Sequence, residues 1–296
     1  MSNMNVFNAL SDCREDYLLD ADPPDPNDPN DKRTRHLGDG GCTNNRGINC
    51  MFTSLYMITL RGAQFLAKEI GKEKDYEDMT KRIEVLEKSI PAAFWNEEKG
   101  LFSDNTEMKY FSPHASLYAF RAGVVSEDKL ERLRETLKPL LNPFFKNGYD
   151  PFSSDYRPSI GGVVFTASFG YHMLDALYKA GLIDTAEYCI REAWGWFLTQ
   201  GLKTTPEHFT LEASQCHAWA ASPAYVLSRH ILGVDFDIKQ GLNNVTLDVK
   251  AGSVKWAKGV FPHPLGGIEI EWHKDENGGI VFDKINAPEG VTVKIK

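Results

Sequence analysis

The sequence lacks the cysteine and charge patterns that mark several large classes of protein. No CxxC pair and no regular Cys/His spacing occurs, so neither a disulfide framework nor a zinc site is predicted. The five cysteines are odd in number and scattered: Cys13, Cys42, Cys50, Cys189 and Cys216. Acidic residues outnumber basic ones by 41 to 33, for a net charge of −8, without a basic stripe. We therefore expect no nucleic-acid partner, and no metal or other cofactor.

Long apolar runs are also missing. No segment approaches the roughly eighteen apolar residues of a transmembrane helix. The N-terminal sequence MSNMNVFNALSDCRED has no apolar core of signal-peptide type. The chain as it stands is expected to be soluble and cytoplasmic, with no membrane partner. If it is a fragment, a targeting signal would lie upstream of Met1, so the localisation is left open.

Apolar and aromatic residues, by contrast, are plentiful. The 296 residues are 42% hydrophobic and 11% aromatic, enough for one large domain or a domain with a small appendage. Seventeen Phe, eleven Tyr and six Trp are typical of proteins that line sugar-binding clefts with rings. A packed helical core explains most of these residues equally well. A neutral or weakly charged ligand fits the composition best.

Helical periodicity occupies most of the chain before residue 234. The segment 20–35, rich in Pro, Asp and Asn, predicts an exposed loop. After it, apolar residues spaced by three and four predict a helix ended by Gly71 and a second helix directly afterwards, together a hairpin. Further helices are predicted at about 113–122, 127–140, 163–180, 184–198 and 213–232, about seven in all.

Local signals predict individual helix ends. Ser126 is a plausible N-cap, and Asp184 with Glu187 three residues later resembles a capping box. Gly181 suits the position that follows a helix. Pro223 lies inside the last predicted helix and should kink or divide it.

The spacing of apolar residues changes at about Val234 from a helical period of 3.6 residues to the period of two that is typical of strands. Alternating apolar residues at 245–249, 268–272, 281–283 and 291–295, separated by turns of Asn, Gly and Pro, predict short strands. We therefore expect a helical domain over 1–233 and a small antiparallel β domain over 234–296. Repeated helical hairpins indicate an α/α toroid, although periodicity alone does not separate a toroid from other helical arrays.

Three motifs separate these alternatives. They are WGWFLTQGLKTTPEHF (194–209), SQCHAWAASPAYVLSRHILGV (214–234) and VKWAKGVFPHPLGGIEIEW (254–272). In this order they resemble the C-terminal part of the bacterial α-L-rhamnosidases of glycoside hydrolase family 78. The resemblance implies a partial six-hairpin (α/α)6 barrel followed by a C-terminal β-sandwich domain. It also implies inverting hydrolysis of terminal α-L-rhamnose from a glycoside, oligosaccharide or polysaccharide.

The resemblance assigns roles to three residues. Glu207 matches the general base, and Thr204, Thr205 and Pro206 before it would fix the backbone that aims its side chain. Without the match, a solvent-exposed loop glutamate is the ordinary explanation. His217 matches a histidine that contacts the sugar, with a bonded core histidine as the alternative. Trp219 is equally suited to stacking on a sugar ring and to packing in the core.

The chain departs from the family in two respects. The family barrel has twelve helices, whereas about seven are predicted here. The family's general acid lies in a motif of Asp-Glu-Arg-x-Gly-Trp type, and the nearest sequence here, DCRED (12–16), lacks the Gly-Trp. The acid is therefore expected upstream of this chain, and the missing N-terminal half of the enzyme is an implied partner. An incomplete barrel would also expose apolar helix faces.

Other residues are weaker candidates for the site. Trp194 and Trp196 fit a packed helix face better than a sugar cleft. Glu212 would be the base if the alignment slips across EHFTLEAS. Polar residues without a residue-level match to the family rank lowest: Asp39, Arg46, Asn49 and His114.

Two further interpretations stay open. The chain could be a non-catalytic sugar-binding remnant that keeps His217 and an aromatic wall. Alternatively, it is a related α/α-toroid hydrolase that acts on another sugar, or a complete small enzyme with a rearranged acid. An in-frame upstream extension carrying the acid motif would favour, over both, a portion of an enzyme that is functional with its missing half. The sequence does not fix the aglycone, the linkage or the oligomeric state.

Overall fold

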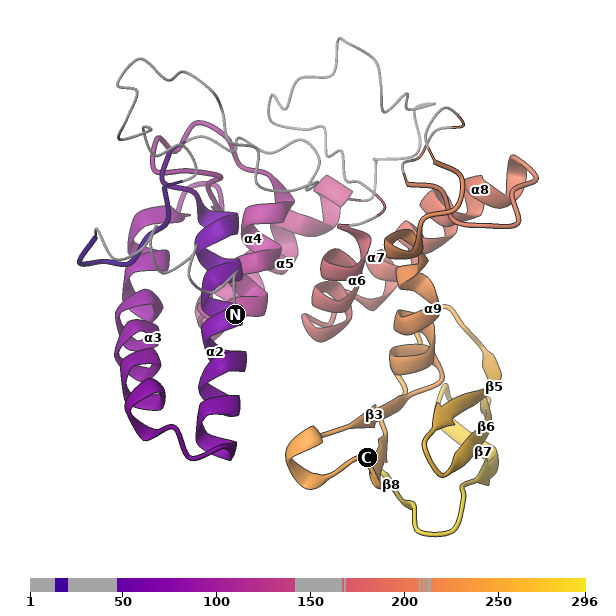
Figure 1. Cartoon of the computed structure of the whole chain (residues 1–296). Helices are drawn as coiled ribbons and strands as arrows, with labels where there is room; N and C mark the ends of the chain where they lie inside the picture. The colour runs from indigo at the N-terminus through magenta and orange to yellow at the C-terminus, as the bar shows by residue number, and fades with distance from the viewer. Residues whose placement is uncertain are drawn as a thin grey trace. The chain divides into compact units, whose positions relative to one another are not determined.

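The computed structural model describes residues 14–20, 47–141, 167, 169–207, 209, 211 and 214–296. The chain divides into two compact units, Met1–Ala176 and Leu177–Lys296, and the division falls inside helix α6 (Gly170–Lys179). Each unit is described by itself (Figure 1). None of the described helices is long and apolar enough to cross a bilayer.

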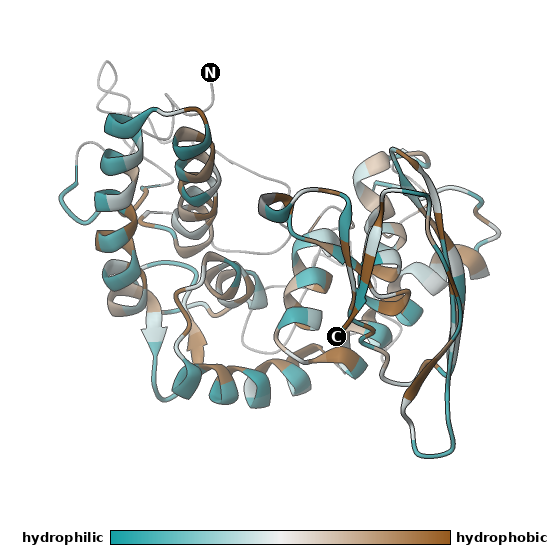
Figure 2. Ribbon diagram, turned by 90° about the horizontal axis from the view of Figure 1, so that it is seen from below, coloured by the Kyte–Doolittle hydropathy of each residue, from teal (hydrophilic) through white to brown (hydrophobic). Residues whose placement is uncertain are grey.

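A helical hairpin begins the first unit. Helix α2 (Cys50–Glu69) starts at Asn49, whose side chain accepts a hydrogen bond from the Phe52 backbone N at 3.1 Å. Helix α3 (Glu73–Phe94) follows after Gly71, which has a φ of +67°. The two helices lie side by side. In Figure 2 the helical ribbons change repeatedly between hydrophilic and hydrophobic residues along their length. The predicted hairpin is therefore confirmed.

One detail of that hairpin differs from the prediction. Leu66 and Ile70 continue the apolar periodicity of α2, yet their side chains are 59% and 68% exposed. They lie at the turn of the hairpin, where the first residues of α3 are exposed as well. The buried part of α3 begins only further along, with Ile83, Leu86, Ile90 and Phe94. Periodicity marks the face of a helix but not the length over which that face is covered.

Two short strands and two further helices follow the hairpin in this unit. Strands β1 (Trp95–Asn96) and β2 (Leu101–Phe102) pair antiparallel. Helix α4 (Pro113–Ala122) has Pro at its first turn and ends at Gly123, where φ is +76°. Helix α5 (Glu127–Leu141) begins directly after Ser126, the predicted N-cap, and buries Leu133, Leu137 and Leu141.

In the second unit, three helical segments follow one another without a break. They are α7 (Ile183–Cys189), the π-helix η1 (Ile190–Trp194) and α8 (Gly195–Thr199). Gly181 has a φ of +78°, as its predicted place after a helix requires. The predicted capping box is wrong: the cap is Leu182, without a side-chain hydrogen bond, because Glu187 binds a loop far along the chain instead.

The last helical region is shorter than predicted. It consists of the 3-10 helix η2 (Ala218–Ala221), helix α9 (Ser222–Val226) and the π-helix η3 (Leu227–Ile231). It therefore begins at Ala218 rather than at 213. Pro223 lies in the first turn of α9, where a helix needs no proline N–H, and the helical region is divided between η2 and α9 next to it, as predicted.

Strands occupy the chain from Val234 onward. A mixed sheet has the order β3-β4-β8, and an antiparallel sheet has the order β5-β6-β7. The strands are β3 (Val234–Phe236), β4 (Asn244–Leu247), β5 (Trp256–His263), β6 (Gly266–Lys274), β7 (Ile280–Asn286) and β8 (Thr292–Ile295), with a 3-10 turn at Ile238–Gln240.

The two sheets correct the expectation of a purely antiparallel β domain. Strand β4 pairs parallel with β8 and antiparallel with β3. The buried Trp272 of β6 donates its indole N–H to the backbone O of Ile231 at 2.9 Å, which ties the antiparallel sheet to the end of η3. The domain boundary at 233/234 and the toroid stay predictions.

Candidate active site

Two of the three residues that the motifs indicate, Glu207 and His217, lie at the ends of one backbone pairing in the second unit. The Glu207 N–H donates to the Ser214 backbone O at 2.7 Å, and the His217 N–H donates to the Thr205 backbone O at 2.8 Å. The Thr205 hydroxyl also donates to the His217 backbone O at 3.2 Å. The segments 205–207 and 214–217 are thereby held next to each other.

This pairing brings the side chains of Glu207 and His217 together. The Nδ1 atom of His217 lies 3.8 Å from Oε2 of Glu207, and the two side chains are 33% and 29% exposed. At that distance the atoms are in ion-pair range when the imidazole is protonated, but they are too far apart for a good hydrogen bond. Both side chains are partly accessible to solvent.

Trp219 extends the cluster. Its ring stacks on the His217 ring, with the centroids 4.3 Å apart and an angle of 24° between the planes. The side chain is 39% exposed, so part of the indole faces solvent. We call Glu207, His217 and Trp219 the site cluster. It combines a carboxylate, an imidazole and an aromatic face, which together can bind the hydroxyls and the C–H face of a sugar.

Of the two other tryptophans of this region, Trp194 is buried and Trp196 is partly exposed. Trp194 is 7% exposed and donates its indole N–H to the Ala220 backbone O at 2.7 Å. Its ring meets Phe209 edge to face at 5.6 Å. The rings of Trp196 and Phe197 also meet edge to face, at 5.8 Å. Trp194 thus holds η2, and with it the backbone next to His217, in place.

Two weaker candidates have structural roles in the first unit. Asn49 is fully buried and caps α2. His114 is fully buried near the start of α4, and its ring stacks on Phe169 with the centroids 3.8 Å apart. Asp39, Arg46 and Glu212 lie outside the described residues.

The sequence nearest to the acid motif, DCRED, contains an ion pair. In DCRED, residues 14–16 are described, and Arg14 contacts Asp16 at 2.5 Å. The hydrogen bond from Arg14 holds the pKa of Asp16 below its usual range. A general acid must carry its proton near neutral pH, which requires a raised pKa. Asp16 is therefore unsuited to that role.

Two features of this unit were not predicted from the sequence. A cavity of about 670 Å³ lies beside the site cluster, lined by α8, η3 and Thr204–Thr205. The carboxylate of Glu187 accepts hydrogen bonds from Gly252 N at 2.8 Å and Ser253 N at 2.9 Å. Among the residues that the structure describes, no group of three or more His, Cys, Asp or Glu side chains could hold a metal ion.

No protein-family model and no curated protein matches the sequence. Among solved structures, the chain is similar to a GH78 family rhamnosidase of Bacillus sp. GL1, with a TM-score of 0.75 and 23% identity over 99% of this chain. A Streptomyces avermitilis α-L-rhamnosidase complexed with L-rhamnose gives 0.70 and 16% over 98%. A rhamnosidase from Klebsiella oxytoca with rhamnose bound gives 0.56 and 19% over 76%.

The share of each neighbour that is matched is much smaller. The chain spans 29%, 26% and 40% of the Bacillus, Streptomyces and Klebsiella proteins. At these identities the likeness shows the fold alone. The resemblance that the three motifs indicate is thus confirmed at the level of the fold, and this chain has the fold of a part of the α-L-rhamnosidases.

Proposed function

We propose that this chain carries the general-base part of a glycoside hydrolase site that removes terminal α-L-rhamnose by inversion. The observation that supports the proposal most is the site cluster, in which Glu207 lies 3.8 Å from His217 and His217 stacks on Trp219. The likeness in fold to rhamnosidases, two of them with rhamnose bound, supports rhamnose as the sugar.

In the proposed reaction, Glu207 takes a proton from a water molecule. The water oxygen attacks the anomeric carbon of the sugar from the face opposite to the leaving group. A general acid from outside these 296 residues donates a proton to the leaving oxygen as its bond to the anomeric carbon breaks. Inverting enzymes hold the two carboxyl groups about 6.5–9.5 Å apart, which leaves room for that water.

The neighbours of Glu207 have binding roles in this proposal. His217 contacts a sugar hydroxyl through its ring, and the exposed part of Trp219 covers the C–H face of the ring. The Glu207 backbone is fixed by its bond to Ser214, so the carboxylate needs little reorganisation when substrate binds. A second candidate function is that of a sugar-binding module. It is favoured by the site cluster's single carboxylate, because inverting hydrolysis needs two.

Titration of this chain with L-rhamnose, followed by NMR, tests the binding part of the proposal. We expect shifts at residues near Glu207 and Trp219. Trp219→Ala should weaken binding about fivefold, because it removes stacking worth about 1 kcal/mol. Glu207→Gln should bind nearly as well as wild type, because an amide keeps the size of the side chain and can still hydrogen-bond to a sugar hydroxyl, as acceptor or donor.

Trp256→Ala is the matched control, because Trp256 is 67% exposed on β5 and outside the site cluster. It should leave rhamnose binding unchanged. Equal losses in the Trp219 and Trp256 variants, or no rhamnose-dependent shift around Glu207, would contradict the assignment of this site.

A further inference from the structure

We propose that the outer face of the antiparallel sheet β5-β6-β7 binds an extended, neutral oligosaccharide of β-linked pyranose rings. This surface is separate from the site cluster and does not depend on the function proposed above. The pairing of the strands defines it, because residues opposite each other on neighbouring strands point to the same side of a sheet. We call it the sheet face; its aromatic and polar residues are Trp256, Lys258, Glu269, Glu271, His273, Asp283 and Lys284.

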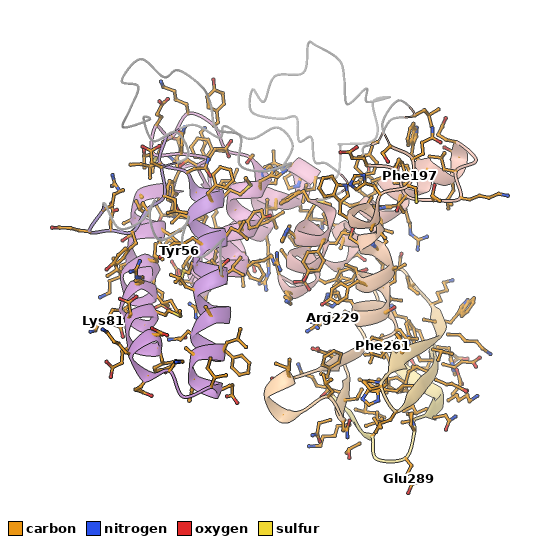
Figure 3. The ribbon with its side chains drawn as sticks, viewed as in Figure 1. Tyr56, Lys81, Phe197, Arg229, Phe261 and Glu289 are labelled. Atoms are coloured by element: carbon orange, nitrogen blue, oxygen red, sulfur yellow. The ribbon has the colours of Figure 1, made fainter. Side chains whose placement is uncertain are left out.

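The sheet has one packed side and one open side. On the packed side, Ile270 and Trp272 of β6 are at most 1% exposed. Phe261 of β5, labelled in Figure 3, also points to this side, and its ring meets that of Phe236 of β3 edge to face at 6.2 Å. Side chains alternate along a strand, so the residues between these point to the sheet face. The sheet therefore contributes to the core with one side and offers the other to a ligand.

Trp256 gives the sheet face an aromatic platform. It is 67% exposed, the most exposed of the six tryptophans of the chain. It lies opposite His273 of β6, whose Nδ1 atom is 2.8 Å from Oδ2 of Asp283 on β7. The exposed indole thus lies next to a polar pair. An indole packs well on the C–H face of a pyranose ring, and polar groups beside it can bind the hydroxyls of that ring.

The charged side chains of the sheet face form ion pairs across the strands. Lys258 Nζ lies 3.0 Å from Glu271 Oε2, and Lys284 pairs with Glu269. The hydrogen bond from Lys284 holds the pKa of Glu269 below its usual range, so this carboxylate is charged near neutral pH. An ammonium has three donors and a carboxylate two acceptor oxygens. Such a pair can therefore also bind a sugar hydroxyl, which both donates and accepts, without being broken.

This distribution of charge fits a neutral sugar chain better than other partners. The carboxylates of Glu269, Glu271 and Asp283 would repel a polyuronate or a phosphate backbone. The centre of a protein–protein interface is depleted of charged residues, whereas ion pairs occupy the middle of the sheet face. Strand β5 is eight residues long, so the face extends roughly 25 Å, enough for several sugar units.

Two hexasaccharides provide the test. Cellohexaose is a neutral, extended chain of β-linked pyranoses, and hexagalacturonic acid has the same number of rings with a carboxylate on each. Isothermal titration calorimetry measures the binding of both to the full 296-residue chain. We expect cellohexaose to bind at least about tenfold more tightly than hexagalacturonic acid at low salt, because the carboxylates of the face repel the acid. Added salt should reduce the difference.

Substitutions locate the binding. Trp256→Ala should weaken cellohexaose binding about fivefold, because it removes stacking worth about 1 kcal/mol. This variant is expected to fold, because the side chain is 67% exposed. Tyr110→Ala is the control, an exposed aromatic residue of the first unit, and it should have no effect. Trp219→Ala should also leave cellohexaose binding unchanged, because Trp219 belongs to the site cluster.

Four results would overturn the proposal. They are a lack of cellohexaose binding, equally tight binding of hexagalacturonic acid, binding that Trp256→Ala leaves unchanged, and a dimer of this chain that Trp256→Ala dissociates, which would make a second copy the occupant. The titration uses no rhamnose and no turnover, and Trp256→Ala leaves the L-rhamnose shifts around Glu207 unchanged. Failure at the sheet face is therefore distinguishable from failure of the proposed rhamnose site.

Discussion

Trp194 and Trp219 differ in what surrounds their rings. The Trp194 ring is almost fully buried, and its N–H holds the Ala220 carbonyl. The Trp219 ring is 39% exposed and stacks on His217. The first residue therefore stabilises the backbone next to the site cluster, whereas the second offers a surface to a ligand.

Replacing Trp194 by Phe separates these two roles. The substitution keeps a ring but removes the donor to Ala220, and the unpaired carbonyl should cost about 1–2 kcal/mol of unfolding free energy. Urea denaturation measures this loss. L-rhamnose affinity should stay within about twofold of wild type, because Trp194 does not contact the sugar in our proposal. A loss of affinity as large as that of Trp219→Ala would instead place Trp194 at the site.

At the residue scale, the motifs predicted which side chains to examine but not how they meet. Glu207, His217 and Trp219 were identified from the sequence alone. Glu207 and His217 are close because the backbone of Thr205–Glu207 pairs with that of Ser214–His217. No pattern of residues in the sequence predicts this pairing. Their catalytic and binding roles stay predictions.

Glu187 connects a helix to the strand region of its unit. Besides the backbone N–H groups of Gly252 and Ser253, its carboxylate accepts the Ser253 hydroxyl. Lys274 of β6 holds the same loop from its carbonyl side, with its Nζ donating to Ala251 O at 2.8 Å and Gly252 O at 2.6 Å. The loop between β4 and β5 is therefore fixed to both α7 and β6.

Removal of the Glu187 carboxylate should destabilise the protein. Glu187→Ala leaves two backbone donors and a hydroxyl without their acceptor, at a cost of about 2 kcal/mol, since the loop is only partly buried. Chemical denaturation measures the change. Glu192→Ala, at an exposed position of η1, should stay within about 0.5 kcal/mol of wild type. Equal stability of the two variants would show that the Glu187 bonds contribute nothing.

Gly233 marks the change from helix to strand. Its φ is +86°, and a Cβ there would lie 2.7 Å from Val249 Cγ2 and 3.1 Å from Val249 N. Gly233→Ala should therefore combine backbone strain with overpacking and cost about 3 kcal/mol. Gly201→Ala, with a φ of +72° and no atom within 4 Å, should cost about 1 kcal/mol. Similar melting temperatures for both variants would refute the contribution of the Val249 contact.

At the element scale, helix ends were the most predictable features. Gly71, Gly181 and Gly233 end helices because a left-handed residue stops the hydrogen-bond ladder, and glycine adopts that conformation most easily. The errors came from long-range partners. Glu187 fits a capping box in sequence, but a loop 65 residues away takes its carboxylate. Strand alternation gave no sign that β4 and β8 pair in parallel.

On the scale of the whole molecule, the fold is that of a part of a larger architecture. The chain spans 29% of the Bacillus rhamnosidase with which it shares that fold. Composition and periodicity alone predicted a helical array followed by strands, and only the motifs pointed to rhamnosidases. The resemblance predicted exposed apolar helix faces in general but not the cavity beside α8, because the exposure of a side chain depends on what lies next to its helix and not on the helix's own pattern.

The central claim is that Glu207 acts as a base at a site completed by residues from outside this chain. It is tested most directly by the turnover of an aryl α-L-rhamnoside in a protein that joins this chain to the remaining part of a rhamnosidase fold. The account predicts activity in the joined protein and little or none in the isolated chain. It also predicts that Glu207→Gln lowers turnover of the joined protein by about 10²–10⁴-fold, with rhamnose binding retained. A Glu207→Gln protein that turns over like wild type would contradict the account and move the base to another carboxylate, with Glu212 the first to examine.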